Sequence, residues 1–388
     1  MAGFVFLCLI WIALFRLFFV AVLSVLSLRI GRPVPIGDLS KVTIIIPARD
    51  EAGVLAEVLT CTLASVAQGA WLVVVDDGST DTSSAIAGRL LADVPRTQLI
   101  TLPTNIGKAR ALNCGLSAVT TPYVLTIDAD TRVDPAAVAQ GLARLERDRS
   151  VDVVAFDVSV MPTTLLFVEI QGVEYDAALN FERRGQSLVR AVSVAPGAAS
   201  LWRADALAAI GGFADATVTE DVDATLCLAA RGRATVHAAG AVAWTDPPQN
   251  LRHLLAQRRR WCLGHYQNIF RHLPRRGKAL AFIWAVYPNF VFLSVFLPAL
   301  ALTALAMLIF GTGGYQDAIW SSTALWLPLV YCQRVLGLWV AGRRSSPLAV
   351  LIEPFTTTLL HAAAALMVFG YWLRVKLGRS VDVWSIRD

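Results

Sequence analysis

The stretch WLVVVDDGSTD, residues 71–81, changes abruptly from apolar to acidic. Its first five residues are tryptophan, leucine and three valines, which predicts a β-strand over 71–75. Two adjacent aspartates, Asp76 and Asp77, follow this strand directly and lead into a Gly-Ser turn. The same order of strand, polar turn and helix recurs on both sides of this stretch.

This alternation runs from residue 42 to residue 127. We expect strands at 42–46, 71–75, 97–102 and 123–127, and helices at 52–64, 82–92 and 107–118. Strands that alternate with helices predict an α/β fold with a doubly wound, mostly parallel sheet. Ligands of such sheets bind beyond the carboxyl ends of the strands.

Acidic residues gather at this predicted edge of the sheet. PARDE (47–51) follows the first strand, Asp76 and Asp77 follow the second, and DADTR (128–132) follows the fourth. Carboxylates at one edge repel one another unless a cation lies among them, and Mg²⁺ or Mn²⁺ is typically held by one or two carboxylates with phosphate oxygens. The pattern predicts a metal-bound nucleotide diphosphate. A dinucleotide oxidoreductase would need G-x-G-x-x-G where this chain has PARDEAG.

The stretch TEDVD, residues 219–223, places three carboxylates at the start of an apolar helical run. One interpretation is a helix cap, with a capping box between Thr217 and Glu220 and with Asp221 and Asp223 at the positive end of the helix dipole. The other is a catalytic carboxylate. The two interpretations are compatible, because a helix N-terminus stabilises the ionised carboxylate that a general base needs.

The composition indicates a membrane protein with a soluble middle. Of the 388 residues 56% are hydrophobic, and the mean hydropathy is +0.57. A cleavable signal peptide does not fit the first apolar run, which is too long and lacks an amino-terminal Lys or Arg. The predicted parts are an amino-terminal transmembrane anchor (1–30), a cytosolic domain (41–276), interfacial and transmembrane helices (279–373) and a tail (374–388).

Basic residues predict the orientation. Eight Lys or Arg and no Asp or Glu lie between 252 and 278, and Arg29, Arg32 and Lys41 follow the first span, so we expect the domain on the cytoplasmic side of a multi-pass protein in the cell (inner) membrane. Four spans, at 2–28, within 279–310, at 318–341 and at 348–373, would then place the basic tail outside. Either 279–310 or the Glu353-Pro354 region is re-entrant, or the tail is an exception.

Polar residues interrupt the predicted spans. These residues are Arg16, Gln333, Arg334, Glu353 and His361. We expect them to face protein or water rather than lipid. The six cysteines contain no C-x-x-C pair and are interpreted as reduced thiols.

The ordered series of motifs resembles one family. PARDE, VVVDDGSTD, NIGKARALN, TIDADT, TEDVD and QRRRW, within about residues 42–270, resemble the membrane-embedded, inverting family 2 glycosyltransferases, such as cellulose, chitin, hyaluronan and poly-N-acetylglucosamine synthases. The resemblance implies a GT-A-like fold and processive extension of a β-linked polysaccharide from a UDP-sugar, with UDP-N-acetylglucosamine expected. One alternative is transfer of a single sugar to a polyprenyl phosphate or other lipid. Another is a transport or scaffold protein that only binds nucleotide.

The resemblance also implies a role for each motif. The nucleotide-sugar would contact Pro47, Arg49, Glu51, Asp76, Asp77, Lys108, Asp128, Gln257 and Arg260. Mg²⁺ or Mn²⁺ would bind Asp130 together with Asp128, and Asp221 would be the general base that accepts the proton of the acceptor hydroxyl. The growing glycan or lipid acceptor would contact Trp261, Gly197 and Glu220.

The segment LRHLLAQRRRWCLGHYQNIF, residues 251–270, predicts a helix. Gln257, Arg260, Trp261 and Gly264 would share one face of it. Arg258 and Arg259 point elsewhere, and they are interpreted as cytoplasmic charges that face lipid.

Two features leave specificity and assembly open. Around 152–186 the chain departs from the pattern of the family, since AFDVSVMPTTL stands where a Gly-Asn or Gly-Asp pair is usual, and the acceptor and the sugar therefore stay undetermined. The resemblance suggests a channel for the growing glycan, and four spans are few for a pore. We therefore expect a partner subunit or an oligomer. We do not expect a nucleic acid partner.

Overall fold

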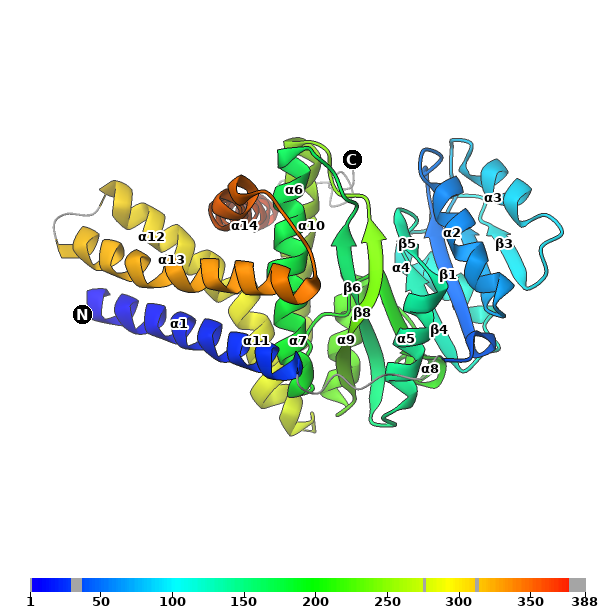
Figure 1. The fold of residues 1–388 in the computed structure, drawn as a ribbon, viewed down its shortest axis with the longest axis horizontal. Helices are drawn as coiled ribbons and strands as arrows, with labels where there is room; N and C mark the ends of the chain where they lie inside the picture. Colours follow the sequence, from blue (N-terminus) through cyan, green and yellow to red (C-terminus); the bar gives the residue numbers. More distant parts are fainter. Residues whose placement is uncertain (1, 29–36, 275–276, 311–313, 377–388) are drawn as a thin grey trace.

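A computed structural model of the protein describes residues 2–28, 37–274, 277–310 and 314–376. Arg29, Arg32 and the predicted tail beyond Lys376 lie outside these ranges. Figure 1 shows a sheet with its covering helices on one side, and the long helices α1 (Ala2–Ser27), α12 (Leu297–Phe310) and α13 (Gly314–Ala341) on the other.

An eight-stranded sheet forms the centre of the α/β domain, in the order β3-β2-β1-β4-β7-β6-β8-β5. Its strands are β1 (Val42–Ala48), β2 (Trp71–Asp76), β3 (Thr97–Thr101), β4 (Tyr123–Ile127), β5 (Thr131–Val133), β6 (Val151–Val160), β7 (Ala199–Arg203) and β8 (Ala234–Thr245). The four predicted strands are confirmed as β1 to β4, and their three pairings are parallel.

The second half of the sheet is mixed, although six of the eight strands run in one direction, as expected for a mostly parallel sheet. β7 is antiparallel to both β4 and β6, β5 is antiparallel to β8, and only β6 and β8 are parallel there. The reason is that the connection from β6 to β7 returns to the sheet at the edge from which it left. The carboxyl ends of β1, β4, β6 and β8 and the amino end of β7 therefore share one edge.

Helices cover both faces of the sheet, as a doubly wound fold requires. One face packs against α2 (Leu55–Ala67), α3 (Ser83–Leu91) and α5 (Pro135–Glu146), and the other against α4 (Lys108–Ser117), α8 (Ala204–Ile210) and α9 (Glu220–Ala230). Successive β1 residues alternate between the two cores: Ile44 and Ile46 belong to the first, and Ile45 to the second.

The first predicted helix begins later than expected, at Leu55. The residues before it are held in a turn, because the Glu51 amide donates to Ser83 Oγ at 2.8 Å and the Ala52 amide donates to Asp81 Oδ2 at 3.0 Å. The polar turn after β1 is thereby tied to the polar turn after β2.

A helical connection joins the sheet to the long helices. It consists of α6 (Leu166–Val173), the π-helix η3 (Glu174–Asn180) and α7 (Phe181–Leu188), and it packs against α1, α13 and α14 (Pro347–Lys376). The predicted helix at 251–270 is confirmed as α10 (Leu251–Arg271), which packs against α14.

The carboxyl-terminal part is mainly helical, with a short non-helical connection at 342–346. It contains η4 (Phe282–Val286), α11 (Tyr287–Val291), η5 (Phe292–Phe296), α12, α13 and α14. Two stretches, Phe282–Leu300 and Pro347–Gly370, are long and apolar enough to cross a membrane, and 28% of each is buried within the protein.

Polar side chains of the long helices α1 and α13 pair with other protein groups. Arg16 Nη2 lies 3.0 Å from Glu182 Oε2, and Arg334 Nε lies 2.5 Å from the fully buried Glu353. The prediction that these two arginines face protein is confirmed. Five cysteines whose side chains the structure describes are free thiols, at positions 61, 114, 227, 262 and 332.

Candidate active site

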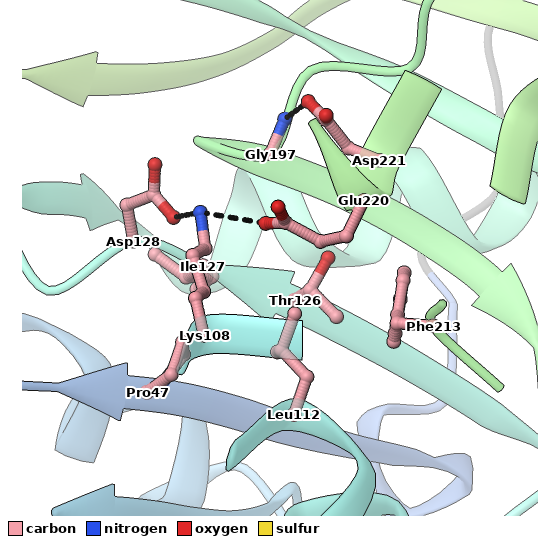
Figure 2. Close-up of a pocket in the computed structure, with 10 residues that line it drawn as sticks. All are labelled: Pro47, Lys108, Leu112, Thr126, Ile127, Asp128, Gly197, Phe213, Glu220 and Asp221. Atoms are coloured by element: carbon pink, nitrogen blue, oxygen red, sulfur yellow. Dashed lines mark hydrogen bonds and ion pairs between the residues drawn. The ribbon is translucent and has the colours of Figure 1, made fainter. Parts of the chain in front are cut away.

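The sheet edge with the carboxyl ends of β1 and β4 forms one wall of a pocket. Ten residues line it, namely Pro47, Lys108, Leu112, Thr126, Ile127, Asp128, Gly197, Phe213, Glu220 and Asp221. Six of them are predicted site residues that come from five separate parts of the chain (Figure 2). The antiparallel β7 is what brings Gly197 here, because this glycine precedes the amino end of that strand.

Lys108 lies between two carboxylates of the pocket (Figure 2). Its Nζ is 2.5 Å from Asp128 Oδ1 and 3.2 Å from Glu220 Oε1. Burial favours the neutral amine, but the charges of Asp128 and Glu220 outweigh it and raise the pKa of Lys108, so the side chain stays an ammonium ion. The pocket therefore holds a fixed positive charge next to the D-x-D motif.

Asp77 positions Lys108 through the backbone. Its Oδ1 accepts the Ile106 amide at 2.7 Å and its Oδ2 accepts the Gly107 amide at 2.9 Å, directly before Lys108. Asp76 Oδ1 accepts the Ser79 amide at 3.2 Å. Both aspartates thus order loops at the sheet edge, and their contact with a nucleobase stays a prediction.

Asp221 is held by backbone amides at the start of α9. Its Oδ2 accepts the Gly197 amide at 2.7 Å and its Oδ1 accepts the Val222 amide at 2.8 Å. A Cβ at Gly197 would lie 3.1 Å from Asp221 Oδ2 and 3.2 Å from Lys108 Nζ, so a glycine permits this close approach. Burial, and next the charge of Glu220, raise the pKa of Asp221 to about 6, against the opposing effect of Lys108.

The predicted capping box is wrong. Thr219 is the residue before α9 and makes no side-chain cap, while Thr217 Oγ1 donates to the Thr219 carbonyl at 3.1 Å. Glu220 pairs with Lys108 instead. The competing interaction is tertiary, since a lysine from α4 reaches the carboxylate that a local capping box would have used.

Helix α10 holds the turn before Asp221. Asn268 Nδ2 donates to Thr219 Oγ1 at 3.0 Å, and Gln267 Oε1 accepts the Val218 amide at 2.9 Å. Gly264 lies so close to Thr219 that a Cβ there would be 2.3 Å from Thr219 Oγ1. A side chain at 264 would therefore push α10 away from the turn that positions Asp221.

The two aspartates of the D-x-D motif, Asp128 and Asp130, lie near the carboxylate of Glu51. Burial and the charge of Asp128 raise the pKa of Asp130 to about 6, and burial with the charges of Asp130 and Asp128 raises that of Glu51 to about 7. In the described part of the chain no three His, Cys, Asp or Glu side chains form a metal site by themselves. A divalent cation bound by one or two carboxylates and by phosphate oxygens needs no third acidic ligand, and it would relieve this concentration of negative charge. The residues present therefore fit such an ion.

Asp246 is a further acidic residue at this edge, and it was not among the site residues predicted from the sequence. It follows β8, its amide donates to the Asp130 carbonyl at 3.2 Å, and its charge contributes to the raised pKa of Glu51. Arg132 Nη2 binds Asp246 at 3.0 Å and Glu57 at 2.8 Å. The available signal was an aspartate directly after an apolar strand, the same signal that marked Asp76 and Asp128.

The remaining predicted residues lie outside this pocket. They are Arg49, Glu51, Asp76, Asp77, Asp130, Gln257, Arg260 and Trp261, and the last three belong to α10. The interpretation of Arg258 as a charge that faces lipid is wrong, because its side chain is buried and pairs with Glu174 Oε2 at 2.7 Å. A helix wheel cannot show this, since the partner comes from η3.

A family model described as "Glycosyl transferase family group 2" matches residues 123–374, which is more than half of the chain. The chain belongs to this glycosyltransferase family. The predicted enzyme class, a family 2 glycosyltransferase, is thereby confirmed.

Curated relatives of this family 2 glycosyltransferase include bacterial polysaccharide synthases. The poly-beta-1,6-N-acetyl-D-glucosamine synthase of Staphylococcus aureus is 25% identical over 245 residues, which are 63% of this chain and 59% of that protein. The enzyme of the same name from Staphylococcus epidermidis is 26% identical over 203 residues, 52% of this chain and 48% of that protein. The chain thus matches less than two thirds of the length of these relatives.

One solved structure shares the fold of this glycosyltransferase. It is a mannosyltransferase from Pyrobaculum calidifontis in complex with GDP-Man and Mn²⁺, with a TM-score of 0.64 and 20% sequence identity. The match covers 93% of this chain and 98% of that one. The prediction of a glycosyltransferase-like α/β fold is confirmed, and the sheet is mixed, with β5 and β7 running against the other six strands.

Proposed function

We propose that this glycosyltransferase is an inverting, metal-dependent enzyme that extends a β-linked polysaccharide at a membrane from a UDP-sugar, UDP-N-acetylglucosamine. The observation that supports this most is the pocket itself. It holds the Asp221 carboxylate, fixed by the Gly197 amide, beside the Lys108 ammonium and Asp128, the first aspartate of the D-x-D motif. A base for the acceptor and positive charge for a diphosphate are therefore available in one cavity.

The donor half of the site binds and neutralises the diphosphate. Asp128 and Asp130 would hold Mg²⁺ or Mn²⁺, which supplies positive charge to the leaving UDP when it is bound. Lys108 adds a second positive charge, and Asp77 fixes its position through the amides of the preceding loop. PARDE, Asp76 and Asp77 surround the nucleoside, and Gln257 and Arg260 reach the donor from α10.

The acceptor half of the site removes a proton. Asp221 accepts the proton of the acceptor hydroxyl as its oxygen attacks the anomeric carbon from the face opposite to UDP, which inverts the configuration. The amides of Gly197 and Val222 orient the carboxylate and keep it ionised at neutral pH. Trp261 offers a flat ring to an acceptor sugar.

The pKa of Asp221 predicts a pH dependence. Because this pKa is raised to about 6, we expect kcat/KM for UDP release to fall as the pH decreases through this value, since protonation removes the base. Below it, the fall should approach about tenfold per pH unit. The measurement is kcat/KM from about pH 4.5 to pH 8, with folding checked at each pH; a flat profile down to about pH 4.5 contradicts the assignment.

A membrane location is supported by exposed apolar side chains. The fractions exposed are 60% for Trp11 and 71% for Phe15 on α1, and 70% for Trp339 on α13. Large apolar patches of this kind mark contact with lipid or protein. We therefore place α1 and the carboxyl-terminal helices in the inner membrane as a multi-pass assembly, with the catalytic domain in the cytoplasm and with a partner subunit or a second copy completing the exit path.

The test uses the full chain in nanodiscs with Mg²⁺ or Mn²⁺ and a panel of UDP- and GDP-sugars. Nucleotide release and product size are read together. We expect release of UDP from UDP-N-acetylglucosamine and a ladder of long products. A single addition to lipid would support the polyprenyl phosphate alternative, and release of GDP alone would contradict the proposed donor.

A further inference from the structure

A buried ion pair lies outside the pocket and is not used by the mechanism above. Arg258 Nη2 of α10 is 2.7 Å from Glu174 Oε2 of η3, and the residues are 2% and 3% exposed. A charge at this depth is costly unless an opposite charge meets it. The position of each side chain therefore depends on the other.

The same arginine stacks on the predicted acceptor residue. The centre of the Arg258 guanidinium lies 4.3 Å from the centroid of the Trp261 ring, one helical turn further along α10. In the described structure the Nε and Nη1 atoms of Arg258 are buried and have no hydrogen-bond partner. Glu174 and the ring are thus the contacts that hold the guanidinium plane.

Trp261 is only half-buried, although it also packs against the main hydrophobic core. Part of its ring is therefore available to a ligand. The guanidinium lies over the face of the indole, and we infer that this cation–π contact restricts the tilt of the ring. Loss of the carboxylate would leave an uncompensated buried cation, and the guanidinium would then leave the ring.

Glu174 begins the π-helix between α6 and α7. π-Helical segments are rare and frequently lie at functional sites. Figure 1 shows α6, α7 and α10 between the sheet and the long helices α12 and α13. The pair therefore joins α10 to a segment that also contacts α13, at the boundary between the catalytic domain and the long helices.

We propose that Glu174 and Arg258 are positioning residues that hold the Trp261 ring in the orientation in which it contacts the acceptor glycan. This inference rests on the proposed function, in which Trp261 binds the acceptor. It predicts that loss of the pair weakens acceptor binding and leaves the donor site intact.

The test is a double-mutant cycle between Glu174→Gln and Trp261→Ala, with UDP-N-acetylglucosamine as donor and a short N-acetylglucosamine oligosaccharide as acceptor. We expect Glu174→Gln to raise the acceptor KM by about tenfold, with kcat and the calorimetric affinity for UDP unchanged. In the Trp261→Ala background the same substitution should have no further effect on acceptor KM. Equal effects in both backgrounds would overturn the positioning role.

A second variant distinguishes positioning from a purely structural ion pair. Arg258→Lys keeps the charge but removes the planar stack, so the acceptor KM should rise as it does for Glu174→Gln. Full rescue by lysine would contradict the proposal, and so would a parallel loss of UDP affinity in Glu174→Gln. Absence of UDP release from the wild-type protein would instead contradict the proposed function.

The matched control is Glu182→Gln. Glu182 pairs with Arg16 at 3.0 Å on the neighbouring helix α7, and the described partners of that arginine are Glu182, Asn289 and the ring of Phe292. Breaking this ion pair should leave the acceptor KM unchanged. An equal rise in KM in this variant would show a general effect of loosening the helices and would overturn the specific role of Glu174.

Discussion

Replacement of Asp221 by asparagine is expected to lower kcat for sugar transfer by about 10²–10⁴-fold, the range for removal of a general base. The amide has nearly the shape of the carboxylate and can still accept a hydrogen bond from Gly197, so the pocket should keep its form. Binding of UDP should therefore be unchanged. The measurements are UDP release with acceptor present and UDP affinity by calorimetry on the same preparation.

Asp223→Asn is the matched control for this prediction. Asp223 lies in the same turn of α9, but it pairs with Arg271 at 2.6 Å and with His272 at 2.8 Å and does not line the pocket. This variant should retain transfer in proportion to the folded fraction. Turnover near the wild-type rate in Asp221→Asn would show that another group accepts the proton.

The second large effect is expected for Asp130→Asn. If the metal stabilises the departing diphosphate by several kcal/mol, its loss corresponds to about 10³-fold in kcat/KM, at about 1.4 kcal/mol per factor of ten. We expect the variant to need a higher Mn²⁺ concentration for half-maximal activity. We also expect chelation to inactivate the wild-type enzyme reversibly. Activity and Mn²⁺ binding by electron paramagnetic resonance are measured over the same titration.

Glu57→Gln controls for loss of an acidic group near this edge. Glu57 is mostly exposed and pairs with Arg132 at 2.8 Å, so its removal should change the Mn²⁺ requirement little. Full wild-type activity in the presence of chelator would contradict the metal-dependent mechanism. An unchanged Mn²⁺ requirement in Asp130→Asn would remove Asp130 from the metal site.

Local sequence determined the first half of the fold. The runs that became β1, β2 and β4 are short and mainly apolar, and an aspartate follows each within two residues, which is enough to predict the strand, its end and the edge at which its acids lie. The order of the motifs predicted the family, which the match over 123–374 confirms. Asp76, Asp77 and Asp128 could be assigned to one edge because parallel strands place their carboxyl ends together. The resemblance to the family added Lys108, which does pair with Asp128.

Tertiary structure decided what no local pattern contains. The direction of β7 places Gly197 against Asp221. Glu220 pairs with the Lys108 ammonium instead of capping its own helix. The partner of Arg258 is Glu174, which belongs to a π-helix and lies 84 positions away in the sequence. The periodicity of a segment shows which of its faces is apolar, but not which distant charge will meet a side chain on that face. Burial then settles the outcome, because a charge removed from water must pair with whichever opposite charge the fold brings to it.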